Sequence, residues 1–201
     1  MRYILFSFLL FPFLSLSQEF QDYTETIEVR FLYGSKPKPG HKKDQKRWFG
    51  GMLGGHVGIK YDENRNLTFF YEGRPHIFQR KNRPCGRYDL QSDSAFNYIM
   101  DEHVDSVKTL VIYIPITYHQ KVKYVSLCAD YVNKSPYDYA FFGVRCAYST
   151  YHILSQIGVV TKYGYFRMWS KVFYPQILRS KLKHQAKKNG WLMIKKKGTH
   201  R

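Results

Sequence analysis

Residues 54–61 read GGHVGIKY and residues 67–72 read LTFFYE, with the polar run DENRN between them at 62–66. Both apolar runs contain the β-branched and aromatic residues that are typical of strands, and the polar run has the composition of a turn. Together the three runs predict an antiparallel β-hairpin. This hairpin governs the interpretation of the whole chain, because its register fixes which side chains can meet.

The first strand of the hairpin carries a candidate catalytic base. Alternate side chains of a strand face opposite sides, so Val57 and Ile59 share the core-facing side while His56 and Gly58 share the other. Gly54 also lies on the face of His56. These small neighbours leave open space around the imidazole, as a base in a cleft requires. The alternative is a solvent-facing histidine without a role.

The register of the hairpin decides which residue could orient His56. If Tyr61 pairs with Leu67, His56 lies directly opposite Glu72, with β-carbons about 4.5–5.5 Å apart. A carboxylate in that place would hold the imidazole tautomer and stabilise its charged form. A register changed by one residue would turn the two side chains to opposite faces. His76, beyond a Gly-Arg-Pro break, is the competing third residue.

Cys146 is the candidate nucleophile. It follows Arg145 at the start of an amphipathic run that ends at Gly158, which predicts a helix that begins at the cysteine. We expect the helix N-terminus and Arg145 to lower the pKa of this thiol toward the thiolate. The same backbone N–H groups could form half of an oxyanion hole. The alternative is a small packing residue at a helix start.

The other two cysteines are weaker candidates. Cys128 lies on a predicted apolar helix stripe with Val122, Val125 and Val132, and we expect it to be a buried core thiol. Cys85 lies in a predicted loop and could be free or oxidised. Three cysteines leave at least one thiol unpaired within the chain, and pairing of Cys85 with Cys128 stays open.

These motifs resemble those of a known enzyme group. A Gly-His-Val-Gly-Ile strand, a Tyr-Glu-Gly strand end and a later cysteine that opens a helix are similar to the circularly permuted papain-like cysteine hydrolases. That group includes permuted NlpC-type peptidases and lecithin:retinol acyltransferase-like acyl enzymes, in which the histidine strand precedes the cysteine. The resemblance covers roughly residues 56–158 and implies Cys146 as nucleophile, His56 as base and Glu72 as orienting residue. Arg145 is a departure, because family members often have Asn or another small polar residue there.

The rest of the chain predicts a single α+β domain. Further strands are expected at 26–33, 107–114 and, as an edge strand, 191–197, with an extension of the hairpin at 76–80; helices are expected at 117–132, 146–158 and 175–189. A small antiparallel β-sheet packed against helices accommodates these elements. The resemblance implies that they follow the papain-like order in its permuted form.

The chain begins with the pattern of an export signal. A positive n-region at residues 1–2 and an apolar run at 4–14 precede a small-x-small cleavage pattern at 15–17. We therefore predict a signal peptide at 1–17 and a cysteine-hydrolase-like domain with a basic C-terminal helix at 18–201. Such a protein would be periplasmic or secreted. A membrane anchor is the alternative, but the apolar run is short and contains a proline.

The chain is strongly basic, with 32 Lys and Arg against 15 Asp and Glu and a net charge of +17. No acidic residue follows Asp138, and a second basic cluster lies at 36–47. This excess suggests an anionic cell-envelope polymer or a lipid surface as a partner, although a merely solvated face is the alternative. Nucleic acid is a weaker candidate, because none of its recognised binding motifs is present. The sequence does not indicate an oligomeric state.

The leading functional hypothesis is an exported cysteine hydrolase that cleaves an amide bond of the cell-wall peptide type through an acyl-enzyme. One alternative is a hydrolase or acyltransferase acting on the acyl groups of lipids or lipoproteins at a membrane surface. Another is a non-catalytic basic protein that binds an anionic polymer or membrane. No cofactor is expected, and zinc is disfavoured because the histidines and cysteines offer no close-spaced ligand pair.

Overall fold

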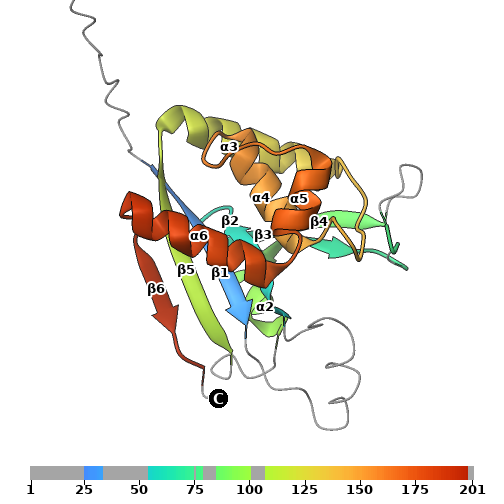
Figure 1. Cartoon of the computed structure of the whole chain (residues 1–201), viewed down its shortest axis with the longest axis horizontal. Coiled ribbons are helices and arrows are strands. Elements are labelled where there is room, and N and C mark those ends of the chain that lie inside the picture. Colours follow the sequence, from blue (N-terminus) through green and yellow to red (C-terminus); the bar gives the residue numbers. More distant parts are fainter. Residues whose placement is uncertain (1–24, 34–53, 75, 79–84, 101–106, 199–201) are drawn as a thin grey trace, which may run out of the picture.

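The computed structural model describes residues 25–33, 54–74, 76–78, 85–100 and 107–198. The described residues form strands and helices in a mixed order (Figure 1). In chain order the elements are β1 (Glu25–Tyr33), β2 (His56–Lys60), β3 (Arg65–Tyr71), β4 (Gly86–Ser92), α2 (Asp93–Tyr98), β5 (Lys108–Ile116), α3 (Tyr118–Asn133), α4 (Cys146–Gln156), α5 (Tyr165–Val172), α6 (Pro175–Asn189) and β6 (Met193–Lys196).

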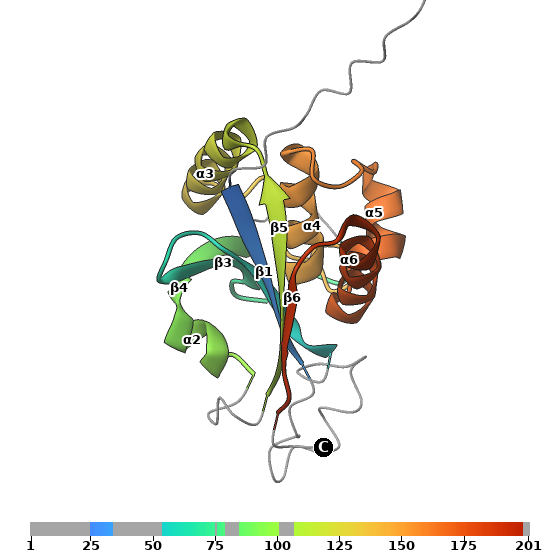
Figure 2. The ribbon, with the colours of Figure 1, turned by 90° about the vertical axis from the view of Figure 1, so that its left-hand side faces the viewer.

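The strands form one six-stranded sheet with the order β4-β3-β2-β1-β5-β6, and every neighbouring pair is antiparallel. Helix α6 covers one face of this sheet and α2 lies against the other, as the side view shows (Figure 2). Helices α4 and α5 lie on the same side as α6 (Figures 1 and 2). The predicted α+β class, an antiparallel sheet packed against helices, is confirmed.

The core is divided between the two faces of the sheet. The larger cluster joins one face of β1 and β5 to α3, α4, α5 and α6, and includes the fully buried Phe31 and Ile112. The smaller cluster lies on the opposite face and contains Leu32, Phe96 and Met100. Nine of the eleven residues of α4 are buried. This helix is therefore a rigid support for the residue at its N-terminus.

Helix α6 begins and ends as predicted. Pro175 occupies its first turn, and Gly190 closes it in the left-handed conformation that glycine adopts without strain. Leu178 and Leu182 are buried against the core. Ile177 in the first turn is 39% exposed.

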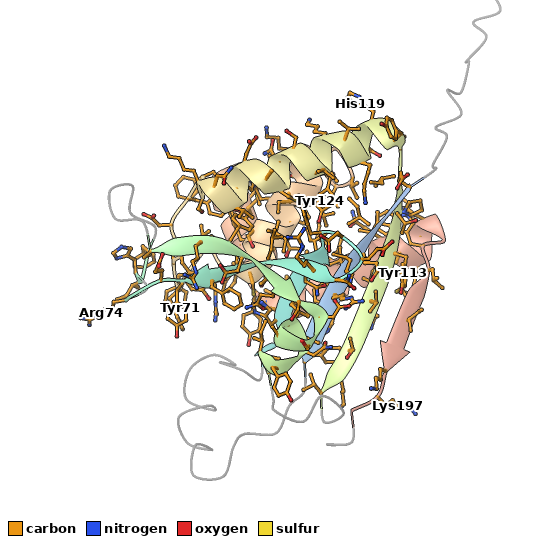
Figure 3. The ribbon with its side chains drawn as sticks, turned by 180° about the vertical axis from the view of Figure 1, so that it is seen from behind. Tyr71, Arg74, Tyr113, His119, Tyr124 and Lys197 are labelled. Atoms are coloured by element: carbon orange, nitrogen blue, oxygen red, sulfur yellow. The ribbon has the colours of Figure 1, made fainter. Side chains whose placement is uncertain are left out.

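The buried face of α3 differs from the predicted stripe. Val122, Val125 and Val132 are exposed, whereas Tyr124 and Cys128 are fully buried. The Tyr124 hydroxyl donates a 2.8 Å hydrogen bond to a backbone carbonyl of β2, and its side chain lies between α3 and the sheet (Figure 3). A tyrosine buries more apolar area than a valine, so the tyrosine face of the helix packs inward.

The hairpin of β2 and β3 closes more tightly than predicted. The carboxylate of Asp62 accepts the backbone N–H of Arg65 at 2.8 Å, and the N–H of Tyr61 donates to the Arg65 carbonyl at 2.9 Å. The ladder therefore pairs Ile59 with Leu67. The predicted pairing of Tyr61 with Leu67 is wrong by two residues. Each side chain stays on its predicted face of the hairpin, but its partner on the opposite strand changes.

Several predicted features lie outside the described residues. These are the signal peptide at 1–17, the basic cluster at 36–47 and the end of the expected extension at 76–80; His76 itself forms a single bridge with Ala140. The elements β4, α2 and α5 were not predicted from the sequence. Among the described residues, no helix combines the length and apolarity needed to cross a bilayer.

Candidate active site

Cys146 is the first residue of α4 and is held against the start of β2. Its side chain is buried, and the backbone N–H of Val57 donates a hydrogen bond to the thiol. The N–H groups of Cys146 and Ala147 in the first helical turn also point to the sulfur. The preceding Arg145 is extended and provides no side-chain cap. The thiol therefore occupies the N-terminus of a rigid helix, as the sequence predicts.

The sulfur lies where β2 and β3 separate. N–H groups of alternate residues in a strand point the same way, and that of Tyr61 points to β3. The N–H of Val57 is therefore directed toward β3 as well, but it meets the Cys146 sulfur instead of a strand oxygen. The Cys146 sulfur thus occupies the open end of the hairpin, where it contacts the backbone of the residue that directly follows His56.

His56 is held rigidly at the same end of the hairpin. Its Nε2 atom forms a short hydrogen bond with the hydroxyl of Thr68 on β3. The ring of Phe70 stacks on the imidazole at 5.2 Å between centroids, and Phe96 of α2 contacts it at 5.8 Å. Only 8% of His56 is exposed. Since Nε2 is bonded to Thr68, Nδ1 is the ring nitrogen left for chemistry.

Glu72 does not face His56, and that prediction is wrong. The tighter turn places Phe70 opposite the histidine, and Glu72 lies beyond the end of β3. Its carboxylate is exposed and makes only a loose ion pair, 3.5 Å long, with Arg87. The neighbouring end of β3 projects from the body of the molecule near Tyr71 (Figure 3).

His76, the competing third residue, lies beside the segment that leads to α4. Its carbonyl accepts the N–H of Phe141 at 2.7 Å. Its Nε2 atom is buried without a hydrogen-bond partner among the described residues. The structure records no bond between the imidazoles of His76 and His56, so we assign the orienting role to Thr68.

Thr68 is the site residue that the sequence analysis missed. It is fully buried and shares a strand face with Asn66 and Phe70. The alternation of the second strand correctly placed even-numbered residues on the face of His56. The missing signal was the length of the turn, which Asp62 shortens by accepting backbone N–H groups.

Burial keeps both candidate catalytic groups neutral at rest. Burial, with the charge of Arg145 as a second cause, lowers the pKa of His56 to about 3. Burial raises the pKa of Cys146, against the opposing effects of Arg145 and the three backbone N–H groups. Our expectation of a lowered thiol pKa is therefore wrong for this closed site. The resting pair is a thiol and a neutral imidazole, with no preformed ion pair.

This protonation state predicts how the reactivity of Cys146 depends on pH. The ordinary thiol pKa of 9.0 is raised at Cys146, while His56 is neutral above about pH 4. We expect the rate of Cys146 alkylation by iodoacetamide to rise continuously from neutral pH to above about pH 9. Mass spectrometry of the Cys146 peptide measures this rate. A plateau between about pH 5 and pH 8 would instead indicate a thiolate–imidazolium pair.

An apolar cavity opens beside Arg145, the residue that precedes the candidate nucleophile. It has a volume of about 270 Å³ and is lined by Phe141, Phe142, Arg145, Phe173, Tyr174 and Ile177. The ring of Tyr174 lies directly against Gly54, two residues before His56. Any side chain at Gly54 would collide with this ring. The cavity therefore borders the candidate site, because Arg145 precedes Cys146 and Tyr174 packs against Gly54.

The remaining thiols are unsuited to catalysis. Cys128 is fully buried in α3, and burial raises its pKa to about 12. Cys85 is buried and donates to the carbonyl of Tyr139 at 3.1 Å. All three cysteines are free, so Cys85 and Cys128 are not paired in this structure. In the described ranges, no three His, Cys, Asp or Glu side chains gather as a metal site.

No protein-family model, curated protein or solved structure matches this chain. A buried thiol at a helix N-terminus contacts the strand residue that follows His56, and Thr68 holds that imidazole in place. These features suit a Cys–His nucleophile pair.

Proposed function

We propose that this protein is a cysteine hydrolase that cleaves an amide or ester bond through a covalent acyl-enzyme. The observation that supports this most directly is the hydrogen bond from the Val57 N–H to the Cys146 thiol, which brings the sulfur to the end of β2 that carries His56. The Val57 N–H fixes the sulfur, and Thr68 holds the imidazole. The order of the histidine strand before the cysteine helix agrees with the permuted papain-like arrangement that the motifs resemble.

In the proposed first step, His56 acts as a general base. With Nε2–H donated to Thr68, the lone pair of Nδ1 takes the thiol proton as the sulfur of Cys146 attacks the substrate carbonyl. The C–S bond forms while the carbonyl oxygen becomes an oxyanion. The first-turn N–H groups of α4, at Cys146 and Ala147, are the donors that would stabilise it.

In the second step, the His56 imidazolium gives its proton to the leaving amine or alcohol, and the carbonyl re-forms as an acyl-enzyme. A water molecule, deprotonated by the same imidazole, then attacks the thioester and releases the acid. The thiol of Cys146 is regenerated by the proton from His56. The low pKa of His56 favours rapid proton return to the leaving group.

Two substrate classes follow from this mechanism. The amide bond of a cell-wall peptide remains our leading proposal, in keeping with the predicted export signal at 1–17 and the periplasmic or secreted location that it would imply. The apolar cavity of about 270 Å³ favours the second class, an acyl ester of a lipid or lipoprotein. A cavity of this size accommodates part of a substrate, such as one side chain or one short acyl chain.

A binding protein is the alternative from a different class. The exposed lysines of α6 and the net charge of +17 would hold an anionic polymer or membrane by electrostatics alone. Such binding weakens steeply with ionic strength, whereas the reactivity of a buried thiol changes little. Salt-sensitive retention on anionic vesicles together with an unreactive Cys146 would support the binding protein.

The test of the proposed hydrolase is covalent labelling by an acyl probe that reacts with nucleophilic thiols. We expect the wild type and Cys128→Ser to be labelled at Cys146, and Cys146→Ala to lose all labelling. Cys128→Ser is a matched control, because it removes another buried thiol from a helix. Labelling that survives in Cys146→Ala would contradict the proposal.

A further inference from the structure

Arg145 is a cation without a carboxylate partner in the described part of the chain. Its Nε atom donates to the hydroxyl of Tyr139 at 3.3 Å, and its guanidinium lies over the rings of Phe141 and Tyr174 at 5.2 and 5.8 Å. Each of these neighbours is aromatic and uncharged. By contrast, Arg30, Arg65 and Arg87 all form ion pairs with acidic side chains.

The positive charge of Arg145 reaches both candidate catalytic groups. It contributes to the lowered pKa of His56 and opposes the burial that raises the pKa of Cys146. It also opposes the burial that raises the pKa of Tyr139 and Tyr174. Arg145 therefore contributes a positive charge beside the candidate nucleophile, and no carboxylate that the structure describes forms an ion pair with it.

The same guanidinium forms part of the wall of the apolar cavity. The other lining residues are aromatic or aliphatic: Phe141, Phe142, Phe173, Tyr174 and Ile177. A ligand in this cavity would thus have an apolar part among the rings and a polar end at the guanidinium. Because Arg145 directly precedes Cys146, that polar end would lie next to the attacked carbonyl.

We infer that Arg145 is a specificity-determining residue that selects a substrate with a carboxylate or phosphate near the scissile bond and an apolar group in the cavity. This inference rests on the proposed function and adds the charge of the substrate. A guanidinium matches the geometry of both oxyanions through paired N–H donors. The aromatic rings hold the side chain in place and exclude water around it.

The experiment compares two alkylating probes of nearly equal size, iodoacetate and iodoacetamide. Each forms a C–S bond with Cys146 and releases iodide, while the thiol proton passes to His56 and then to solvent. Iodoacetate has a carboxylate beside the reacting carbon, and iodoacetamide has a neutral amide. We expect the ratio of their rates at Cys146 to exceed the ratio for free cysteine by about tenfold.

Variants distinguish the effect of Arg145 from the effect of the protein's overall positive charge. Arg145→Gln should bring the ratio down to that of free cysteine, and Arg145→Lys should restore part of it. Arg65→Gln is the matched control, because it removes one positive charge at the opposite end of the hairpin, where Arg65 is paired with Asp62. An unchanged ratio in Arg145→Gln would overturn the inference. So would a wild-type ratio equal to that of free cysteine, which requires no variant.

Protection assays distinguish the two oxyanions and test the cavity. Hexanoate and hexyl phosphate are compared with hexan-1-ol as inhibitors of Cys146 alkylation by iodoacetamide. Protection by hexanoate alone assigns a carboxylate, protection by hexyl phosphate alone assigns a phosphate, and equal protection by hexanol refutes selection by charge. If Cys146 reacts with neither alkylating probe, the proposed hydrolase itself fails, whereas equal reactivity with both refutes only the role of Arg145.

Discussion

Replacing His56 with alanine is expected to lower kcat/KM by roughly 10³–10⁴-fold and to leave the fold intact. The imidazole is the general base that we propose for the Cys146 thiol, and Glu72, the other candidate, points to solvent. The raised pKa of Cys146 makes the effect large, because little thiolate forms without a base. The release rate of a chromogenic thioester leaving group, measured at saturating and limiting substrate, tests this expectation.

The cavity left by His56→Ala offers a direct control. The removed ring lies between Phe70 and Phe96, and these rings leave a site of matching shape. Added imidazole should therefore restore part of the rate in His56→Ala and have no effect on Cys146→Ala. Such rescue identifies a missing base and excludes a misfolded site.

A second histidine, which is partly buried, provides the matched variant. His152 lies on α4, where burial lowers its pKa to about 4, and it stacks on Tyr131 and Tyr148. His152→Ala removes a comparable side chain from the same helix that carries Cys146. We expect it to cost stability but to retain turnover. A loss of activity in His152→Ala as large as in His56→Ala would indicate that both act only through folding.

Thr68→Val is expected to give a smaller loss, of about tenfold, because it removes one neutral hydrogen bond and keeps the shape of the side chain. The hydroxyl bonds Nε2 of His56 and so fixes the tautomer and the direction of Nδ1. The pH profile should change along with the rate, since Nε2–H loses its acceptor. A variant with unchanged rate and profile would show that Thr68 is only a packing residue.

The parts of the site that the sequence predicted are those set by local rules. Strand alternation placed His56 away from the core face of Val57, and a helix ending at Gly158 placed Cys146 at its first turn. Both placements follow from neighbouring residues alone. That the two residues, ninety positions apart in the chain, act as one catalytic pair remains our proposal, which the resemblance to permuted papain-like enzymes suggests.

The features that the sequence did not predict depend on distant contacts. The hairpin register changed because the Asp62 carboxylate accepts N–H groups within the turn, and this replaced Glu72 by Thr68 beside the ring. The thiol pKa rises because the surrounding core buries the sulfur, which outweighs the helix N-terminus. The cavity is lined by residues from separate segments of the chain. These residues become neighbours only when α5 and α6 pack beside the segment that leads to α4.

The substitution Gly58→Ala is expected to lower the free energy of unfolding by about 2–3 kcal/mol. A β-carbon at Gly58 would lie 2.7 Å from the Phe96 ring and 2.9 Å from the Leu67 carbonyl oxygen. The ring belongs to the smaller core cluster and the oxygen to the backbone of β3, so neither can yield freely. The gain from a less flexible unfolded chain, about 0.4–1 kcal/mol, is too small to offset this overlap.

The same substitution should also disturb the candidate active site. Phe96 contacts both Gly58 and the imidazole of His56, so a ring displaced by the new methyl group presses on the base. We therefore expect slower labelling of Cys146 in the folded fraction, together with a lower midpoint in urea. Gly164→Ala is the control, because a β-carbon there has no neighbour within 4 Å and the backbone φ of −65° suits alanine; its cost should stay below about 1 kcal/mol. Equal stability of the two variants would show that Gly58 is not tightly packed, and the support of His56 by α2 would have to be abandoned.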